Sequence, residues 1–240
     1  MKLQKTLVAA FVALTFSATT FAQTAEEIVA KHIAARGGAD KMATVKTLIV
    51  DNSMAVQGMD IPMVTTTVRG VGMRNEVTVM GNSMLTIMKV GGGWISMPAM
   101  MGGSGSPEDM PADQAKAITL ADLDPFAPLA GLKESGTTIE LVGTEKVNGK
   151  DAYNLKLTKG GKSSNVYIDV ASSMMVKTKG PGIGGTDQEM VMSDFKAVDG
   201  IIFPFTITTQ SPMGGDMTIT CNKVLINPTV DEKIFVKPAN

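Results

Sequence analysis

The chain has 240 residues, of which 22 are basic and 23 acidic, so its net charge is −1. Without an excess of lysine and arginine to neutralise phosphates, nucleic-acid binding is not expected. The single cysteine, Cys221, excludes an internal disulfide, and the fold must therefore be stabilised by an apolar core, which a chain of this length can build.

The N-terminal segment 1–22 predicts a cleaved secretory signal peptide. Two lysines precede an apolar run over 7–16, and a small-x-small cleavage site follows at 20–22. The apolar run is too short to span a bilayer as a helix, and residue 23 is Gln rather than the Cys of a lipid anchor. We therefore expect 23–240 to form one periplasmic domain with no stable membrane anchor.

A capped amphipathic helix is predicted at the start of this domain, in "TAEEIVAKHIAARGG". Thr24 and Glu27 have the spacing of a capping box, and Gly37-Gly38 supplies a C-terminal stop. A short second helix or turn follows over 39–46. The only histidine, His32, lies on the first helix, where a structural role is favoured over catalysis.

From Thr47 onward the apolar residues alternate, which predicts β-strands. About five strands are expected before the glycine-rich segment 91–111, with a hairpin turn at Gly81-Asn82. About six more are expected after Thr137, with turns at Asn148-Gly149 and Asp199-Gly200 and a loop over 180–185. Between the two groups, three prolines limit the chain to helical turns near 112–118 and 125–133.

The short connections between strands exclude parallel crossovers and predict an antiparallel sheet. An antiparallel sheet of this length must curl to bury one face. The expected fold class is therefore mainly β (α+β). It is a single curved antiparallel sheet forming an incomplete β-barrel, covered by the N-terminal helix and the short helical insert.

The apolar residues of 23–240 include 18 methionines but only eight aromatic residues. Methionine is flexible and polarizable, and it suits adaptable apolar surfaces as well as irregular cores. The composition is therefore compatible with a methionine-rich binding surface and with a methionine-rich core. Either way, the methionines are the most unusual feature of the domain.

Motifs for catalysis and metal binding are absent from the sequence. There is no G-x-S-x-G nucleophile elbow and no Cys/His cluster for zinc. Four methionines, Met97, Met100, Met101 and Met110, would suit Cu(I), but no His or Cys lies near them in the sequence to complete a site. Spacing alone does not exclude a pair of carboxylates brought together by the fold. We expect no enzymatic activity, no cofactor and no metal.

Five stretches, taken together and in order, point to a known family: "TAEEIVAKHIAARGGADKMATVKTL", "VNGKDAYNLKLTK", "NVYIDVASSMMVK", "FKAVDGIIFPFTI" and "VLINPTVDEKIFVKP". With them, 23–240 resembles the LolA/LolB-like superfamily of periplasmic outer-membrane lipoprotein-sorting proteins. The resemblance implies a strongly curved half-barrel with a helical lid, and an apolar cavity for acyl chains of a lipoprotein or another lipid. It also implies a strand arginine that contacts the lid, for which Arg69 and Arg74 are both candidates. The cavity of the archetypal carrier is rich in aromatic residues, whereas this chain has few aromatic residues and many methionines.

The predicted function is that of a non-catalytic carrier or sensor that binds a lipid or a lipoprotein acyl chain. Six residues on the strand at 84–90 and in the segment 91–111 are expected to line or cover the cavity: Met84, Met88, Trp94, Met97, Met100 and Met101. The alternative is an interaction module for another envelope protein, in which the methionines fill the core.

Overall fold

The computed structural model describes residues 23–56, 58–127, 129, 131–132, 135–181, 187–210 and 215–238. The predicted signal peptide lies outside this part of the chain, as does most of the predicted loop over 180–185. Within it, no helix has both the length and the apolar character needed to cross a membrane.

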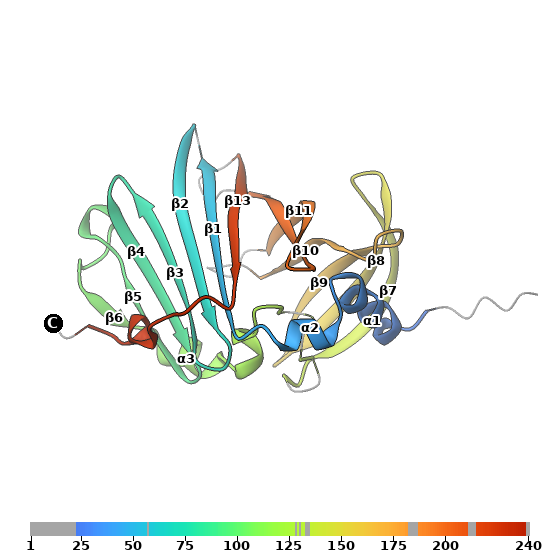
Figure 1. Ribbon diagram of the computed structural model, residues 1–240, viewed down its shortest axis with the longest axis horizontal. Helices are drawn as coiled ribbons and strands as arrows, with labels where there is room; N and C mark the ends of the chain where they lie inside the picture. The colour runs from blue at the N-terminus through green and yellow to red at the C-terminus, as the bar shows by residue number, and fades with distance from the viewer. Residues whose placement is uncertain are drawn as a thin grey trace, which may run out of the picture.

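The described residues form one antiparallel sheet of thirteen strands (Figure 1). Its spatial order is β6-β5-β4-β3-β2-β1-β13-β12-β11-β10-β9-β8-β7. The strands are β1 (Thr47–Val56), β2 (Met59–Val68), β3 (Gly72–Val79), β4 (Asn82–Lys89), β5 (Gly92–Ser96), β6 (Pro107–Asp109), β7 (Thr138–Val147), β8 (Lys150–Lys159), β9 (Lys162–Asp169), β10 (Met175–Pro181), β11 (Asp187–Val198), β12 (Ile201–Gln210) and β13 (Asp216–Ile226). The helices are α1 (Ala25–Ala35), α2 (Ala39–Ala43) and α3 (Ala112–Ala117), with 3-10 turns η1 (Ala99–Met101), η2 (Leu120–Leu123) and η3 (Glu232–Phe235).

The sheet is open, because its outer strands β6 and β7 do not pair with each other. The first and last strands, β1 and β13, pair in the middle and join the two halves of the chain. In Figure 1, β1 to β6 form a broad wall, and the strands from β10 to β7 turn away from it beside α1 and α2. The predicted fold class, an incomplete antiparallel barrel with an N-terminal helix and short helices, is confirmed.

Alternation along the strands divides the sheet into two faces. On one face, which we call the helix face, Ile28 and Val29 of α1 pack with Leu155, Val166 and Ile168 of β8 and β9. A second cluster on the same face joins α2 and the insert to β1, β12 and β13. The opposite face, which we call the outer face, carries the C-terminal tail.

The capping box predicted for the first helix is present. The Thr24 hydroxyl accepts a hydrogen bond from the Glu27 amide at 3.2 Å, and the Glu27 carboxylate accepts one from the Thr24 amide at 3.1 Å. At the other end, the amide of Ile202 donates to the carbonyl of Arg36 at 2.8 Å. The helix is therefore capped locally at its N-terminus and tied to β12 at its C-terminus.

The insert between β6 and β7 contains less helix than the sequence predicts. The helical turn expected near 112–118 corresponds to α3, but the described residues of 125–133 form turns, and the second helical piece is η2. The insert is held by apolar anchors instead, since Leu123, Phe126 and Leu129 are almost completely buried. Asp124 also accepts a hydrogen bond from the Phe126 amide at 2.8 Å, which satisfies a donor that a helix would have used.

Two of the three predicted hairpin turns are confirmed. Asn148-Gly149 and Asp199-Gly200 both have the positive φ angles of a two-residue turn. The third turn is shifted by one residue, because Val79 pairs with Asn82 and the turn consists of Met80 and Gly81. Six strands precede the insert rather than about five, since the three-residue β6 is too short to show an alternation. Seven strands follow the insert rather than about six.

Candidate functional site

Half-buried methionines lie next to one another on the helix face of β1 to β4. Met63 of β2 pairs with Val77 of β3, which pairs in turn with Met84 of β4. Met73 of β3 pairs with Met88 of β4 in the same way. We call this surface the methionine face, and it consists of Met54, Ile61, Met63, Met73, Val77, Met84 and Met88.

The methionine face is separate from the packed core. None of the apolar clusters formed by the described residues includes its five methionines. Their side chains are half-buried, although they lie on the same face of the sheet as α1 and the insert. The methionine face therefore consists of two apolar patches, Met54, Ile61, Met63, Val77 and Met84 in one and Met73 and Met88 in the other, separated by the polar row of Thr65, Asn75 and Thr86.

The structure places Trp94 on the outer face, away from Met84 and Met88. Trp94 pairs with Ile87, whereas Met88 pairs with Gly93, so their side chains leave the sheet on opposite sides. Trp94 is 5 % exposed and packs with Val68, Ile87 and Phe235. Its indole Nε1 donates to the Phe235 carbonyl at 3.2 Å. Trp94 thus anchors the C-terminal tail to the sheet.

The segment after β5 forms a structured hairpin tip at the edge of the sheet. The Met97 carbonyl accepts a hydrogen bond from the Gly105 amide at 3.1 Å, and β6 then returns along β5. Gly103 permits this close approach, since a Cβ there would lie 2.0 Å from the Met97 carbonyl oxygen. Met97 and Met101 are half-buried, and Met100 is exposed.

The two candidate arginines differ in their contacts. Arg69 forms an ion pair with Asp124 of the insert, and it donates to the carbonyls of Val45 at 2.9 Å and Met42 at 2.8 Å. Arg74 instead pairs with Glu76 of its own strand, at 2.8 Å, on the outer face. Of the two, only Arg69 contacts the helical insert.

Arg36, which the sequence did not single out, also contacts the insert, through Phe126. The guanidinium of Arg36 lies 5.2 Å from the ring centroid of Phe126 and 5.9 Å from that of Phe203. Its Nε donates to the Ile202 carbonyl at 3.2 Å. Burial lowers the pKa of Arg36 to about 10, and the charge of Asp124 opposes this shift, so the guanidinium stays charged at neutral pH.

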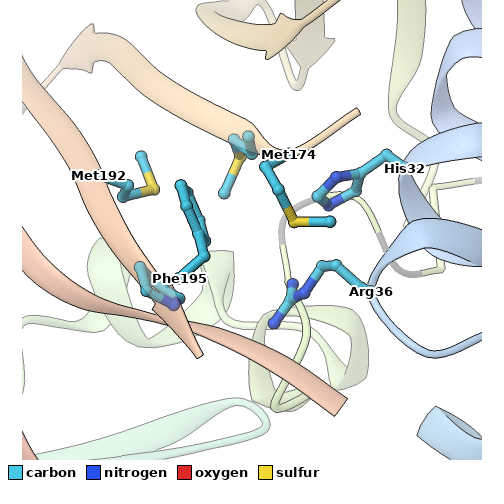
Figure 2. Close-up of a pocket in the computed structure, with 7 residues that line it drawn as sticks. His32, Arg36, Met174, Met192 and Phe195 are labelled. Carbon is cyan, nitrogen blue, oxygen red and sulfur yellow. The ribbon is translucent and has the colours of Figure 1, made fainter. Parts of the chain in front are cut away.

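His32 lies at a small apolar cavity between α1 and the sheet (Figure 2). Its Nδ1–H donates to the Ser173 carbonyl at 2.8 Å, which ties α1 to the turn between β9 and β10. Burial lowers the pKa of His32 to about 4; the hydrogen bond to Ser173 opposes this shift, and the nearby charge of Arg36 adds a smaller lowering. The imidazole is therefore neutral at physiological pH.

The cavity beside His32 has a volume of about 20 Å³ and is lined by Met174, Met175, Met192, Phe195 and Pro204. That volume holds about one water molecule. A groove of about 800 Å³ shares Met174, Met192 and Phe195 with it and extends along the turns at 146–151 and 169–172. Neither cavity is lined by any of the eight site residues expected from the sequence.

The described residues offer little for catalysis or metal binding. They contain no group of three or more His, Cys, Asp or Glu side chains that could hold a metal ion. Cys221 is buried, and burial raises the pKa of its thiol, which makes it a poor nucleophile. Among the described residues, the methionine face is therefore the best candidate for a ligand-binding surface, and it suits an apolar ligand.

No protein-family model matches the chain, and no curated protein matches it significantly. Solved structures do match. A LolA superfamily protein from Nitrosomonas europaea is 16 % identical, with a TM-score of 0.59, and the match covers 90 % of this chain and 99 % of that one. A Vibrio parahaemolyticus domain named for outer membrane lipoprotein sorting is also 16 % identical, with a TM-score of 0.58 and coverages of 88 % and 95 %. A DUF1329 family protein from Desulfovibrio piger is 14 % identical, with a TM-score of 0.58 and coverages of 88 % and 96 %.

At such low identity these matches establish the architecture. The alignments extend over almost the whole of each solved chain, so the likeness concerns the complete open sheet with its helices. The chain therefore has the fold of the LolA superfamily.

Proposed function

We propose that this protein is a non-catalytic periplasmic carrier or sensor, which binds the acyl chain of a lipid or lipoprotein on the methionine face. The observation that supports this proposal is the register that brings the half-buried Met63 and Met84 to either side of the buried Val77, across three strands. Burial of an acyl chain against such a surface stabilises the complex by about 0.8 kcal/mol for each CH₂ group.

Methionine suits a ligand whose shape varies. Its unbranched side chain has three rotatable bonds, so a surface of methionines can repack around chains of different length or unsaturation. Two of the polar side chains on the same face are already paired with each other, since Asn75 donates to the Thr65 hydroxyl at 2.9 Å.

The proposal is tested with two adjacent substitutions on β2. Met63 faces the helix side and Val64 the outer side, and both are half-buried. Met63→Ser is expected to weaken binding of a fluorescent fatty acid about tenfold, because it removes one apolar contact from the ligand. Val64→Ser is the control and should leave that affinity unchanged. Fluorescence titration gives both values.

Equal losses in the two variants would contradict binding on the methionine face. Lipid extraction and mass spectrometry of the protein from its own host identify the natural ligand. A protein that carries no lipid and takes up no fatty acid would favour the alternative, an interaction module for an envelope protein. The ten-residue outer strand β7, whose outer edge is unpaired in the sheet, is the surface best suited to such a partner.

A further inference from the structure

Three successive hairpins end in exposed methionines at the same end of the sheet. Met59 begins β2 and is 45 % exposed, Met80 lies in the turn between β3 and β4 and is 77 % exposed, and Met100 lies between β5 and β6 and is 62 % exposed. Because β2 pairs with β3 and β4 with β5, neighbouring tips lie about 10 Å apart. We call these three residues the methionine rim. The turns between β1 and β2 and between β3 and β4 project at the top of Figure 1.

The backbone at Met80 is unusual for its residue type. Met80 has a φ of 48°, in the left-handed region that favours Gly, Asn and Asp. The other described non-glycine residues with positive φ are all small and polar: Asn148, Ser173, Asp194, Asp199 and Asn227. No packing compensates for the strain at Met80, since its side chain is almost fully exposed. A methionine at this position is therefore unfavourable both for the turn and for an exposed surface.

The methionine rim is also uncharged. The described tip residues 58–59, 80–81 and 97–106 contain no Lys, Arg, Asp or Glu, and Asp60 is the first charge beyond the first tip. At the opposite end of β4, by contrast, the turn at Val90 follows directly on Lys89. The three methionine side chains can therefore enter an apolar boundary while the adjacent charge of Asp60 stays at the level of the headgroups.

The rim is continuous with the methionine face. Met59, Ile61 and Met63 alternate along β2 on the helix face, and Met84 is the third residue of β4 after the turn. An apolar chain that arrives at the methionine rim first meets Met59, Ile61 and Met63 of β2. The exposed tips thus lead directly to the patch that Met63, Val77 and Met84 form on this face.

We propose that the methionine rim docks on the surface of a lipid bilayer, with Met59, Met80 and Met100 inserted at the boundary between headgroups and acyl chains. The ligand then enters the methionine face from this end. Only this second statement rests on the proposed function, because docking itself requires no uptake. Three separate projecting tips fit a soft bilayer surface better than the flat patch that a protein partner requires.

The experiment compares two turn residues at opposite ends of β4. Met80→Asn removes an apolar tip and places a residue favoured at positive φ, so the variant is expected to fold at least as stably as the parent. Val90→Asn is the matched control, since Val90 is a turn residue that is 51 % exposed outside the rim. Flotation of the exported protein with phosphatidylethanolamine vesicles, with and without phosphatidylglycerol, measures docking.

We expect Met80→Asn to weaken vesicle binding about tenfold and Val90→Asn to leave it unchanged. Salt and phosphatidylglycerol should have little effect, because the rim carries no charge. Absence of vesicle binding by the parent protein, equal losses in both variants, or binding that requires phosphatidylglycerol and low salt would overturn the proposal. Loss of capture of an envelope protein without any vesicle binding would assign the rim to a protein partner and would overturn it as well.

Fatty-acid uptake from solution separates this proposal from the proposed function. Uptake needs the methionine face but no membrane, so Met80→Asn should retain it. A parent protein that binds vesicles but takes up no fatty acid would disprove the proposed function while leaving the rim as a docking surface.

Discussion

His32 shows how a single side chain can couple the stability of the protein to pH. Its ring is 2 % exposed and donates to the Ser173 carbonyl, so the folded protein holds it neutral, with a pKa of about 4. In the unfolded chain the ordinary pKa of 6.5 applies. Between these two values the unfolded chain binds a proton that the folded protein does not, and stability therefore falls as the pH falls.

This effect gives a prediction for His32→Asn, which keeps a donor near the position of Nδ1 but does not titrate. The free energy of unfolding of the parent protein should decrease below pH 6.5 by up to about 1.4 kcal/mol per pH unit from this residue. In the His32→Asn variant, the free energy of unfolding should lack this part of its dependence on pH. Urea unfolding at several pH values between about 7 and 4.5 measures the difference, and identical slopes would show that His32 does not control it.

At the scale of elements, the insert is held to the sheet by a few long-range contacts. Phe126 lies between Arg36 and Arg69, with ring-to-guanidinium distances of 5.2 Å and 5.9 Å. Asp124, two residues earlier, pairs with Arg69. Lys159 at the end of β8 adds a second tie through Asp122 at 2.9 Å. These contacts, rather than helix formation, determine where the insert lies.

Arg69→Ala and Arg74→Ala are expected to differ strongly in stability. Arg69→Ala removes an ion pair and two hydrogen bonds to backbone carbonyls, and it leaves the Val45 carbonyl without its arginine donor, which should cost about 2 kcal/mol. Arg74→Ala removes a partly exposed pair within one strand and should cost less than about 1 kcal/mol. Guanidinium unfolding of both variants tests this, and similar losses would show that Arg69 does not anchor the insert.

Local sequence signals predicted the elements that depend on local interactions. The capping box at Thr24 and the turns at Asn148 and Asp199 involve residues within a few positions of one another. The anchors of the insert were not predictable in this way, because Arg69 and Asp124 are separated by 55 positions. The turn at Met80 was placed one residue late, since sequence preference favours Asn at such a position rather than Met.

The register of the paired strands determines which site residues lie side by side, and this could not be predicted from the sequence. Alternation in 84–90 shows that Met84 and Met88 share a face, but it does not show which face Trp94 shares across a glycine-rich turn. The pairing of Trp94 with Ile87 decides this, and a tail more than a hundred residues away covers the indole. The neighbours of Met63 on β1 and β3 likewise become known only when the strands are paired.

At the scale of the molecule, the pairing of β1 with β13 sets the division between the two faces. The last strand pairs with the first in the middle of the sheet, and the tail after β13 then crosses the outer face toward β5. There Phe235 packs against Gly72, where a Cβ would lie 3.0 Å from the ring. The tail thus covers the part of the outer face around Trp94, while the methionines on the opposite face stay half-buried.

The position of Trp94 determines what optical spectroscopy of this protein reports. It is the only tryptophan of the chain, and its indole lies beneath Phe235 rather than on the methionine face. Saturation with a fatty acid should therefore leave the emission maximum unchanged, whereas Phe235→Ala should shift the emission to longer wavelength by admitting water. A shift caused by the fatty acid would instead mean that occupancy of one face moves the tail on the other, and the intrinsic fluorescence would then record a coupling through the thickness of the sheet.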